Sequence, residues 1–213
     1  MDCCADMVAA ARAGHLGCLK YAHENGCSWD RVTSAAAEEG HLDCLKYAHE
    51  NGSPWDPETT WSAAYGGHMD CLMYAHVNGC TWHPETTRPA AFGGHLECIR
   101  YAHENGCPWY QYTTCAAAGC GYLECLRYAH ENGCPWSPDT TWAAAICGHL
   151  DCLKYAHGNG APSVGDWAKR VIHRMRGITD LLSDNTTYFS AIPRDIHGII
   201  VKFYVGSMLH SPR

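Results

Sequence analysis

Histidine and cysteine recur along this chain at spacings that could bind a metal ion. Fifteen Cys and fifteen His are present among 213 residues, and one recurring pattern is His-x2-Cys-x4-His-x3-Cys. Its first occurrence comprises His15, Cys18, His23 and Cys27. Both residue types are zinc ligands. A zinc-binding repeat array is therefore one hypothesis for this sequence.

The spacing of these residues on a helix argues against a metal site in each copy. Cys18 and His23 are five residues apart, which points their side chains about 140° away from each other. The pattern is also incomplete, because Tyr122 stands in one His position, and Ser53 and Ala161 replace the last Cys. We therefore predict no metal site and no cofactor, and expect the cysteines to act as small buried side chains.

The same residues do not form a catalytic set. Nucleophilic catalysis needs a nucleophile, a base and a group that orients the base, whereas here the His and Cys columns recur in every copy. Cys115 and Cys120 are the exceptions, because most other copies lack them. The sequence therefore predicts a protein that is not an enzyme. Fast, selective alkylation of Cys115 or Cys120 would argue otherwise.

A tandem repeat of 26 to 27 residues accounts for these patterns. Each copy contains a Gly-His-Leu anchor or a close variant, then a Cys, then Tyr-Ala-His, and then Asn-Gly. The anchors begin at Gly14, Gly40, Gly67, Gly94, Gly121 and Gly148. Six copies at a near-constant period indicate an array in which each unit buries its apolar face against its neighbours.

Each copy is predicted to contain two helices. The second begins at the anchor, where Leu42, Leu45 and His49 recur at three and four residues. The first begins after a constant Trp, where Asp56-Pro57-Glu58 offers an N-cap, a Pro at the first helical position and an acidic first turn. The predicted starts of the later first helices are near Asp30, Pro57, Pro84, Gln111 and Pro138. No segment alternates with period two, so we predict an all-α solenoid of six helix-turn-helix repeats over residues 1–161.

The second half of each copy resembles the second helix of an ankyrin repeat. Residues 40–52, Gly-His-Leu-Asp-Cys-Leu-Lys-Tyr-Ala-His-Glu-Asn-Gly, carry the resemblance, with Ala-Ala three residues ahead of the Gly in most copies. The repeat is shorter than the ankyrin period of about 33 residues, and a Cys- and Trp-containing connector replaces the hairpin loop. Short arrays of this type are familiar from protists and their large DNA viruses. The resemblance implies a protein-interaction scaffold without a cofactor, and the short connector argues against the β-hairpin fingers of typical ankyrin repeats.

Positions that vary between copies predict a binding face on the first helices. Residues four apart share one helix face, and aromatic and Arg side chains are typical of interfaces. The predicted protein-binding residues are Asp56, Trp61, Tyr65, His83, Arg88, Phe92, Tyr110, Cys115, Trp142 and Ile146. The alternative is that the large members fill gaps between helices. A constant column is predicted to be structural, with a ligand-stacking ladder as its alternative: Trp29, Trp55, Trp82, Trp109 and Trp136.

Charge and hydropathy exclude several classes of partner. Residues 1–161 carry eight Lys or Arg against eighteen Asp or Glu, which does not suit a phosphate backbone. The sequence contains no 18-residue apolar run and no apolar signal segment at its start. We therefore expect no nucleic acid or membrane partner, and an intracellular, cytoplasmic monomer with thiols rather than disulfides. If the source is a virus, the location would be the host cytoplasm.

Residues 162–213 differ from the repeats and carry seven Lys or Arg against four Asp or Glu. They are predicted to form a helix that caps the array, followed by a second amphipathic helix. The start of the second helix resembles the opening of an F-box, and poxviral ankyrin proteins end in a similar truncated F-box. The resemblance implies a substrate receptor that binds a cullin-ligase adaptor through Ile192, Pro193, Asp195, Ile196, Ile200 and Tyr204. The alternative is a plain repeat scaffold in which this helix only docks on the solenoid.

Overall fold

The computed structural model describes residues 6–162, and this part of the chain consists of paired helices without strands. The first helices of the six copies are α1 (Met7–Arg12), α3 (Val32–Glu38), α5 (Thr59–Gly66), α7 (Thr87–Gly93), α9 (Thr113–Cys120) and α11 (Thr140–Ile146). The second helices are α2 (Leu16–Glu24), α4 (Leu42–Glu50), α6 (Met69–Val77), α8 (Leu96–Glu104), α10 (Leu123–Glu131) and α12 (Leu150–Gly158). None of these twelve helices is long and apolar enough to cross a membrane.

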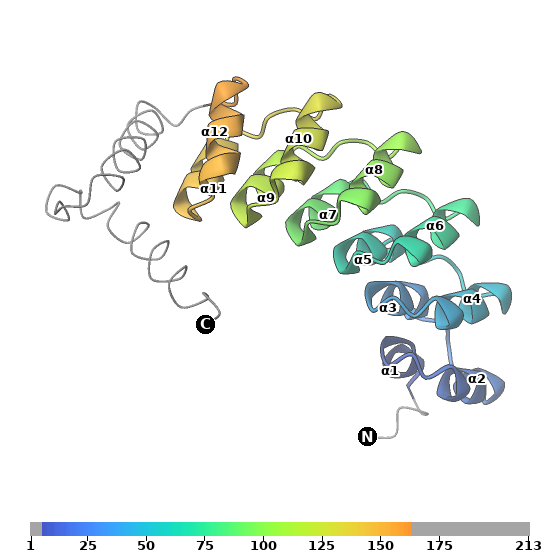
Figure 1. Ribbon diagram of the computed structural model, residues 1–213. Coiled ribbons are helices and arrows are strands. Elements are labelled where there is room, and N and C mark those ends of the chain that lie inside the picture. Colours follow the sequence, from blue (N-terminus) through green and yellow to red (C-terminus); the bar gives the residue numbers. More distant parts are fainter. Residues whose placement is uncertain (1–5, 163–213) are drawn as a thin grey trace, which may run out of the picture.

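The helix pairs stack into an arc, with the first helices on the concave side and the second helices on the convex side (Figure 1). Neighbouring first helices pack more closely than neighbouring second helices, which produces the curvature. The predicted all-α solenoid is thereby confirmed for the described residues. Residues 163–213, which carry the predicted capping and F-box-like helices, lie outside the described part of the chain.

The second helices begin where the apolar periodicity predicts. In α4, Cys44, Leu45 and Ala48 are buried, while the exposed Asp43 occupies the first turn, where the helix dipole favours an acid. The helix ends at the predicted left-handed glycine, since Gly52 has a φ of 88°. One fully buried aliphatic residue from each copy forms a continuous central row: Leu19, Leu45, Leu72, Ile99, Leu126 and Leu153.

The first helices begin two to three residues later than predicted. In copy three the Asp56 side chain does act as a cap, but it accepts the N–H of Glu58 at 3.0 Å, within a turn that precedes the helix. The N–H of Thr59 closes this turn by donating to the Asp56 carbonyl at 3.0 Å. The predicted starts at Asp30, Pro57, Pro84, Gln111 and Pro138 therefore belong to turns, and the helices follow them.

The anchor glycine of one copy packs against the anchor histidine of the next. Gly67 has a φ of 74°, which favours glycine, and a Cβ built there would lie 2.4 Å from ring atoms of His95. Gly40 has the same relation to His68. The histidine can also bond the preceding copy, because His41 Nε2 lies 3.0 Å from the carbonyl oxygen of Arg12. The recurring anchor glycine and the ring that follows it, which is His in most copies and Tyr122 in one, therefore join neighbouring copies.

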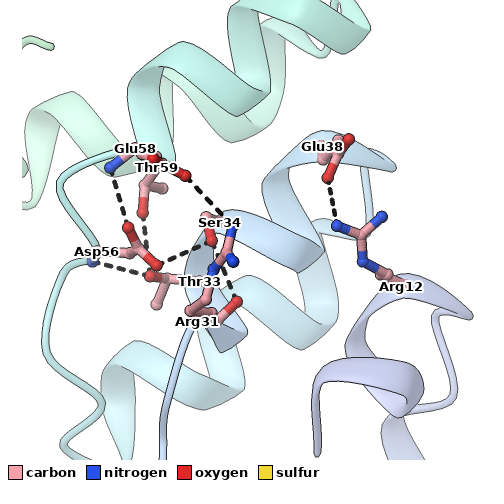
Figure 2. Close-up of polar contacts among 8 residues, drawn as sticks. All are labelled: Arg12, Arg31, Thr33, Ser34, Glu38, Asp56, Glu58 and Thr59. Atoms are coloured by element: carbon pink, nitrogen blue, oxygen red, sulfur yellow. Dashed lines mark hydrogen bonds and ion pairs between the residues drawn. The ribbon is translucent and has the colours of Figure 1, made fainter.

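A ladder of buried threonine pairs also connects adjacent copies. The hydroxyl of Thr87 lies 2.9 Å from that of Thr113, and Thr87 Oγ1 also accepts the backbone N–H of Tyr110 at 3.2 Å. The other hydroxyl pairs are Thr33–Thr59, Thr60–Thr86 and Thr114–Thr140, and Figure 2 shows the first of them. Each pair satisfies groups that would otherwise be buried without a partner.

Replacing Thr87 with Val is expected to destabilise the array by about 1–3 kcal/mol, because it leaves the Tyr110 N–H and the Thr113 hydroxyl buried without this partner. Urea unfolding followed by circular dichroism measures the change. Thr81→Val is the matched control at an exposed position and is expected to change stability by less than about 0.5 kcal/mol. Equal effects of the two substitutions would show that the ladder contributes nothing.

The constant Trp column is structural, as predicted. Trp55 stacks on His49 with ring centroids 4.4 Å apart and contacts the edge of Tyr74 in the next helix pair. Its indole N–H donates to the Asn78 carbonyl at 3.0 Å. The same bond joins Trp82 to Asn105, Trp109 to Asn132, and Trp136 to Asn159. These four indoles therefore connect consecutive copies.

The connector of copy two departs from this regularity. Only Asp30 and Arg31 separate Trp29 from α3, whereas Asp56-Pro57-Glu58 separates Trp55 from α5. Arg31 takes a φ of 53°, a left-handed value that no other non-glycine residue adopts within residues 6–162. Such a backbone costs an L-residue about 1–2 kcal/mol. The missing residue therefore strains this connector.

Candidate protein-binding face

The largest predicted binding residues lie on the concave side and are accessible. Tyr65 and Phe92, on α5 and α7, keep 45% and 56% of their surface exposed. Trp142 and Ile146, on α11, keep 47% and 49%. Side chains with this much free surface do not fill gaps between helices, so the gap-filling alternative does not fit these four residues.

Trp61, Tyr65, Arg88 and Phe92 come together across α5 and α7. The rings of Trp61 and Tyr65 are stacked, with centroids 5.3 Å apart and planes 4° from parallel. With Pro89, these residues line a groove of about 260 Å³, which we call the aromatic groove. The Arg88 guanidinium donates to the Glu85 carboxylate at 3.1 Å, an exposed ion pair that leaves further N–H groups of Arg88 available.

The aromatic groove is separated from the second apolar pair by small residues. Cys115, which is half-buried, and Gly119 occupy the corresponding positions of α9. Trp142 and Ile146 follow on α11. Because Cys and Gly project little from the helix, the concave face alternates between large apolar side chains and a low strip at α9.

The three connector residues predicted for the binding face do not line the aromatic groove. The Asp56 carboxylate accepts the Ser34 hydroxyl at 2.9 Å, and His83 Nδ1 accepts the N–H of Glu85 at 3.2 Å. Tyr110 packs beside Tyr112 with ring centroids 5.7 Å apart. Asp56 instead lines a separate hollow of about 750 Å³ between the connectors of copies two and three. His83 thus stabilises its own turn, whereas Asp56 both caps its own turn and bonds α3 of the preceding copy.

The concave face is charged at its N-terminal end. Arg12 pairs with Glu38 at 2.9 Å, and Arg31 pairs with Glu58 at 3.4 Å, as Figure 2 shows. Glu38 holds the position that Tyr65 and Phe92 hold in the next two copies. Exposed pairs of this kind add about 0–1 kcal/mol each to stability. The apolar part of the face therefore begins at α5.

The repeated Cys and His residues do not converge on a metal. Within residues 6–162, no group of three or more His, Cys, Asp or Glu side chains could hold an ion. Several of the helix-end histidines instead contact a tyrosine of the next copy, as His23 Nδ1 does at 2.9 Å from the Tyr47 hydroxyl. The zinc hypothesis therefore has no ligand set in the described residues.

The expectation of thiols holds for twelve cysteines of the described region but not for Cys18, which is disulfide-bonded. The equivalent Cys44 is 1% exposed, whereas Cys18 is only partly covered because it lies in the first copy. Cys115 and Cys120 are weak nucleophiles, because burial raises the pKa of both thiols.

Alkaline pH is expected to destabilise the array through its buried thiols. Burial, reinforced by the charge of Asp70, raises the pKa of Cys71 from 9.0 to about 12. Because the folded state favours the protonated Cys71 thiol, the contribution of this thiol to the free energy of unfolding is complete below pH 9.0. That contribution is lost as the pH rises towards 12. Between pH 8 and 10, Cys71→Ala should remove about 1.4 kcal/mol of this loss, measured by urea unfolding at each pH. An unchanged pH dependence in Cys71→Ala would contradict the assignment.

Comparison with known proteins places this architecture among ankyrin-repeat solenoids. No protein-family model matches the chain, and no curated protein matches its sequence. The crystal structure of the human ASB11 ankyrin repeat domain is similar in fold, with a TM-score of 0.62 and 16% identity, covering 86% of this chain and 99% of that chain. At this identity the likeness establishes the fold alone. The F-box-like pattern and the protist or viral source stay predictions.

Proposed function

We propose that this chain is a protein-binding scaffold whose partner docks on the concave face, centred on the aromatic groove. The observation that carries the proposal is that constant and varying positions of the repeat make different contacts. The constant Gly, His, Thr and Trp positions make contacts between copies, whereas the varying positions on α5 and α7 present a half-buried Trp61 and the exposed Tyr65, Arg88 and Phe92. Trp, Tyr and Arg are the side chains that most often dominate binding energy.

The composition of the groove defines the part of the partner that would enter it. An apolar or aromatic side chain would pack against the Trp61–Tyr65 stack and Phe92, and an acceptor group would bond the free N–H groups of Arg88. Trp142 and Ile146 would then contact a second apolar segment of the same partner. The small side chains at Cys115 and Gly119 leave room for the backbone of the partner between its contact with the aromatic groove and its contact with Trp142 and Ile146.

The test is to capture partners with the whole chain in which residue 92 carries a photo-crosslinker, and then to compare two double variants. Trp61→Ala with Phe92→Ala removes the groove, whereas Met73→Ala with Val77→Ala removes exposed apolar side chains from the convex α6. We expect the groove variant to lose at least about tenfold in affinity and the control to bind normally. Equal binding by both would refute a role for the groove. Circular dichroism verifies that both variants fold.

We further propose that the scaffold is a substrate receptor for a cullin-type ubiquitin ligase, acting as an intracellular monomer. The support is the sequence pattern Ile192, Pro193, Asp195, Ile196, Ile200 and Tyr204, which lies outside the described residues. A pull-down of the ligase adaptor with the whole chain and with a chain stopped at Ala161 tests it. Retention by the whole chain alone, lost in Ile196→Ala, supports the receptor. Retention by neither chain leaves a plain scaffold.

A further inference from the structure

Each copy ends in an Asn-Gly dipeptide, which is chemically labile because the glycine nitrogen is unhindered. In deamidation this backbone nitrogen loses its proton to solvent and attacks Cγ of the asparagine side chain. A C–N bond forms, ammonia leaves, and a succinimide ring results. Water then opens the ring to aspartate or isoaspartate, so the net change is one water consumed and one ammonia released.

The native conformation opposes this reaction at Asn51 and Asn78 alike. Both residues cap a helix with ψ values of 19° and 21°. Each side-chain amide donates to the carbonyl four residues earlier at 2.8 Å, and each following glycine N–H donates to a His carbonyl at 3.1 Å. These hydrogen bonds must break before the Asn–Gly peptide plane can rotate and bring the glycine nitrogen to Cγ of the asparagine.

The two sites differ in one further bond to that peptide plane. The carbonyl of Asn78 accepts the Trp55 indole N–H at 3.0 Å. Trp29 is the equivalent residue for Asn51, but within the described residues its indole makes no such bond. Its ring is tilted by 44° against His23, whereas Trp55 lies at 20° to His49. Trp29 directly precedes the shortened connector of copy two, in which Arg31 takes its left-handed φ of 53°.

We propose that Asn51-Gly52 is a deamidation site of the folded array. It is exposed, and its peptide plane is held by one bond fewer than the planes at Asn78, Asn105, Asn132 and Asn159, which all accept an indole N–H. Those four sites therefore react more slowly than Asn51 while the array is folded. Asn25 is exposed like Asn51, and within residues 6–162 its carbonyl accepts no indole N–H. We therefore expect Asn25 to react as Asn51 does.

The product would weaken the junction between copies one and two. A carboxylate at residue 51 cannot donate to the Tyr47 carbonyl, and it places negative charge at the C-terminal end of α4, where the helix dipole disfavours it. Tyr47 also contacts His23 of the preceding copy at 2.9 Å. Deamidation therefore acts as a slow, irreversible change in the stability of this end of the array.

The test incubates the whole chain in mildly alkaline buffer and follows each Asn-Gly site by peptide mass mapping. One hydrogen bond fewer predicts deamidation at Asn51 roughly 2- to 12-fold faster than at Asn78 in the folded protein. In concentrated urea the two rates should be equal. Equal rates in the folded protein would overturn the proposal.

Two variants make the cause explicit. Trp55→Phe keeps the ring but removes the donor, and should raise the rate at Asn78 towards that of Asn51. Replacing Arg31 by the pair Pro-Glu restores the connector length found at Pro57-Glu58, and should slow Asn51 without changing Asn78. A folded Trp55→Phe chain with an unchanged rate at Asn78 would refute the protective role of the indole.

Discussion

Gly67→Ala is expected to lower the free energy of unfolding of the array by about 2–5 kcal/mol. This loss is larger than most single substitutions at surface positions cause. Two costs combine at this position. The φ of 74° strains any residue with a Cβ, and that Cβ would lie 2.4 Å from the His95 ring, which must then move. Because His95 packs at the junction between copies three and four, its displacement also weakens the contact that propagates the fold. Urea unfolding measures the loss.

Gly79→Ala separates the two costs. Gly79 has a similar φ of 87°, but a Cβ there would meet nothing within 4 Å. This control should therefore lose only the backbone component, about 1–2 kcal/mol. Equal losses at residues 67 and 79 would mean that the glycine–histidine contact carries no energy and that backbone strain explains the constant glycine.

Leu72→Ala is expected to cost about 2–5 kcal/mol, because Leu72 is fully buried in the central row and its truncation leaves a cavity. In a one-dimensional array, a defect in the third copy also interrupts the coupling between its two sides. The urea transition should therefore become broader as well as occurring at a lower concentration. Circular dichroism and tryptophan fluorescence, recorded together, would detect a loss of coincidence between the two signals.

Met73→Ala provides the control on the same helix. Met73 is 41% exposed on the convex side, so its truncation should cost less than about 1 kcal/mol and leave the transition sharp. A broad transition in Met73→Ala, or a sharp one in Leu72→Ala, would contradict the view that coupling passes through the central row.

The parts of the fold that follow from short-range periodicity were predictable. The burial of Cys44 and Leu45 and the left-handed Gly52 follow from the sequence of one copy. Comparing the copies identified Tyr65 and Phe92 as varying positions but left open whether they are accessible or fill gaps between helices, and the structure shows them exposed. These features depend on residues a few positions apart, or on the repeat itself.

The individual hydrogen bonds between copies were not predicted, because they join residues 21 to 29 positions apart. The Thr-Thr dipeptide recurs at Thr59, Thr86, Thr113 and Thr140, and this constancy was the available signal for the buried ladder. The Trp61–Tyr65 stack depends on side-chain rotamers, which spacing alone does not determine. The strain at Arg31 could have been inferred from the one step of 26 residues among steps of 27.

The near-identical junctions have a mechanical consequence. Because the Thr pairs and Trp–Asn bonds repeat with almost constant geometry, each copy should resist a pulling force about equally. Stretching the chain from its ends should therefore release one copy at a time, each adding roughly 90 Å of extended chain. The exception is the copy-two connector, where the strained Arg31 and the missing indole bond should give the lowest force peak. Under force the array would therefore lengthen in steps of nearly equal size, and copy two would unfold first.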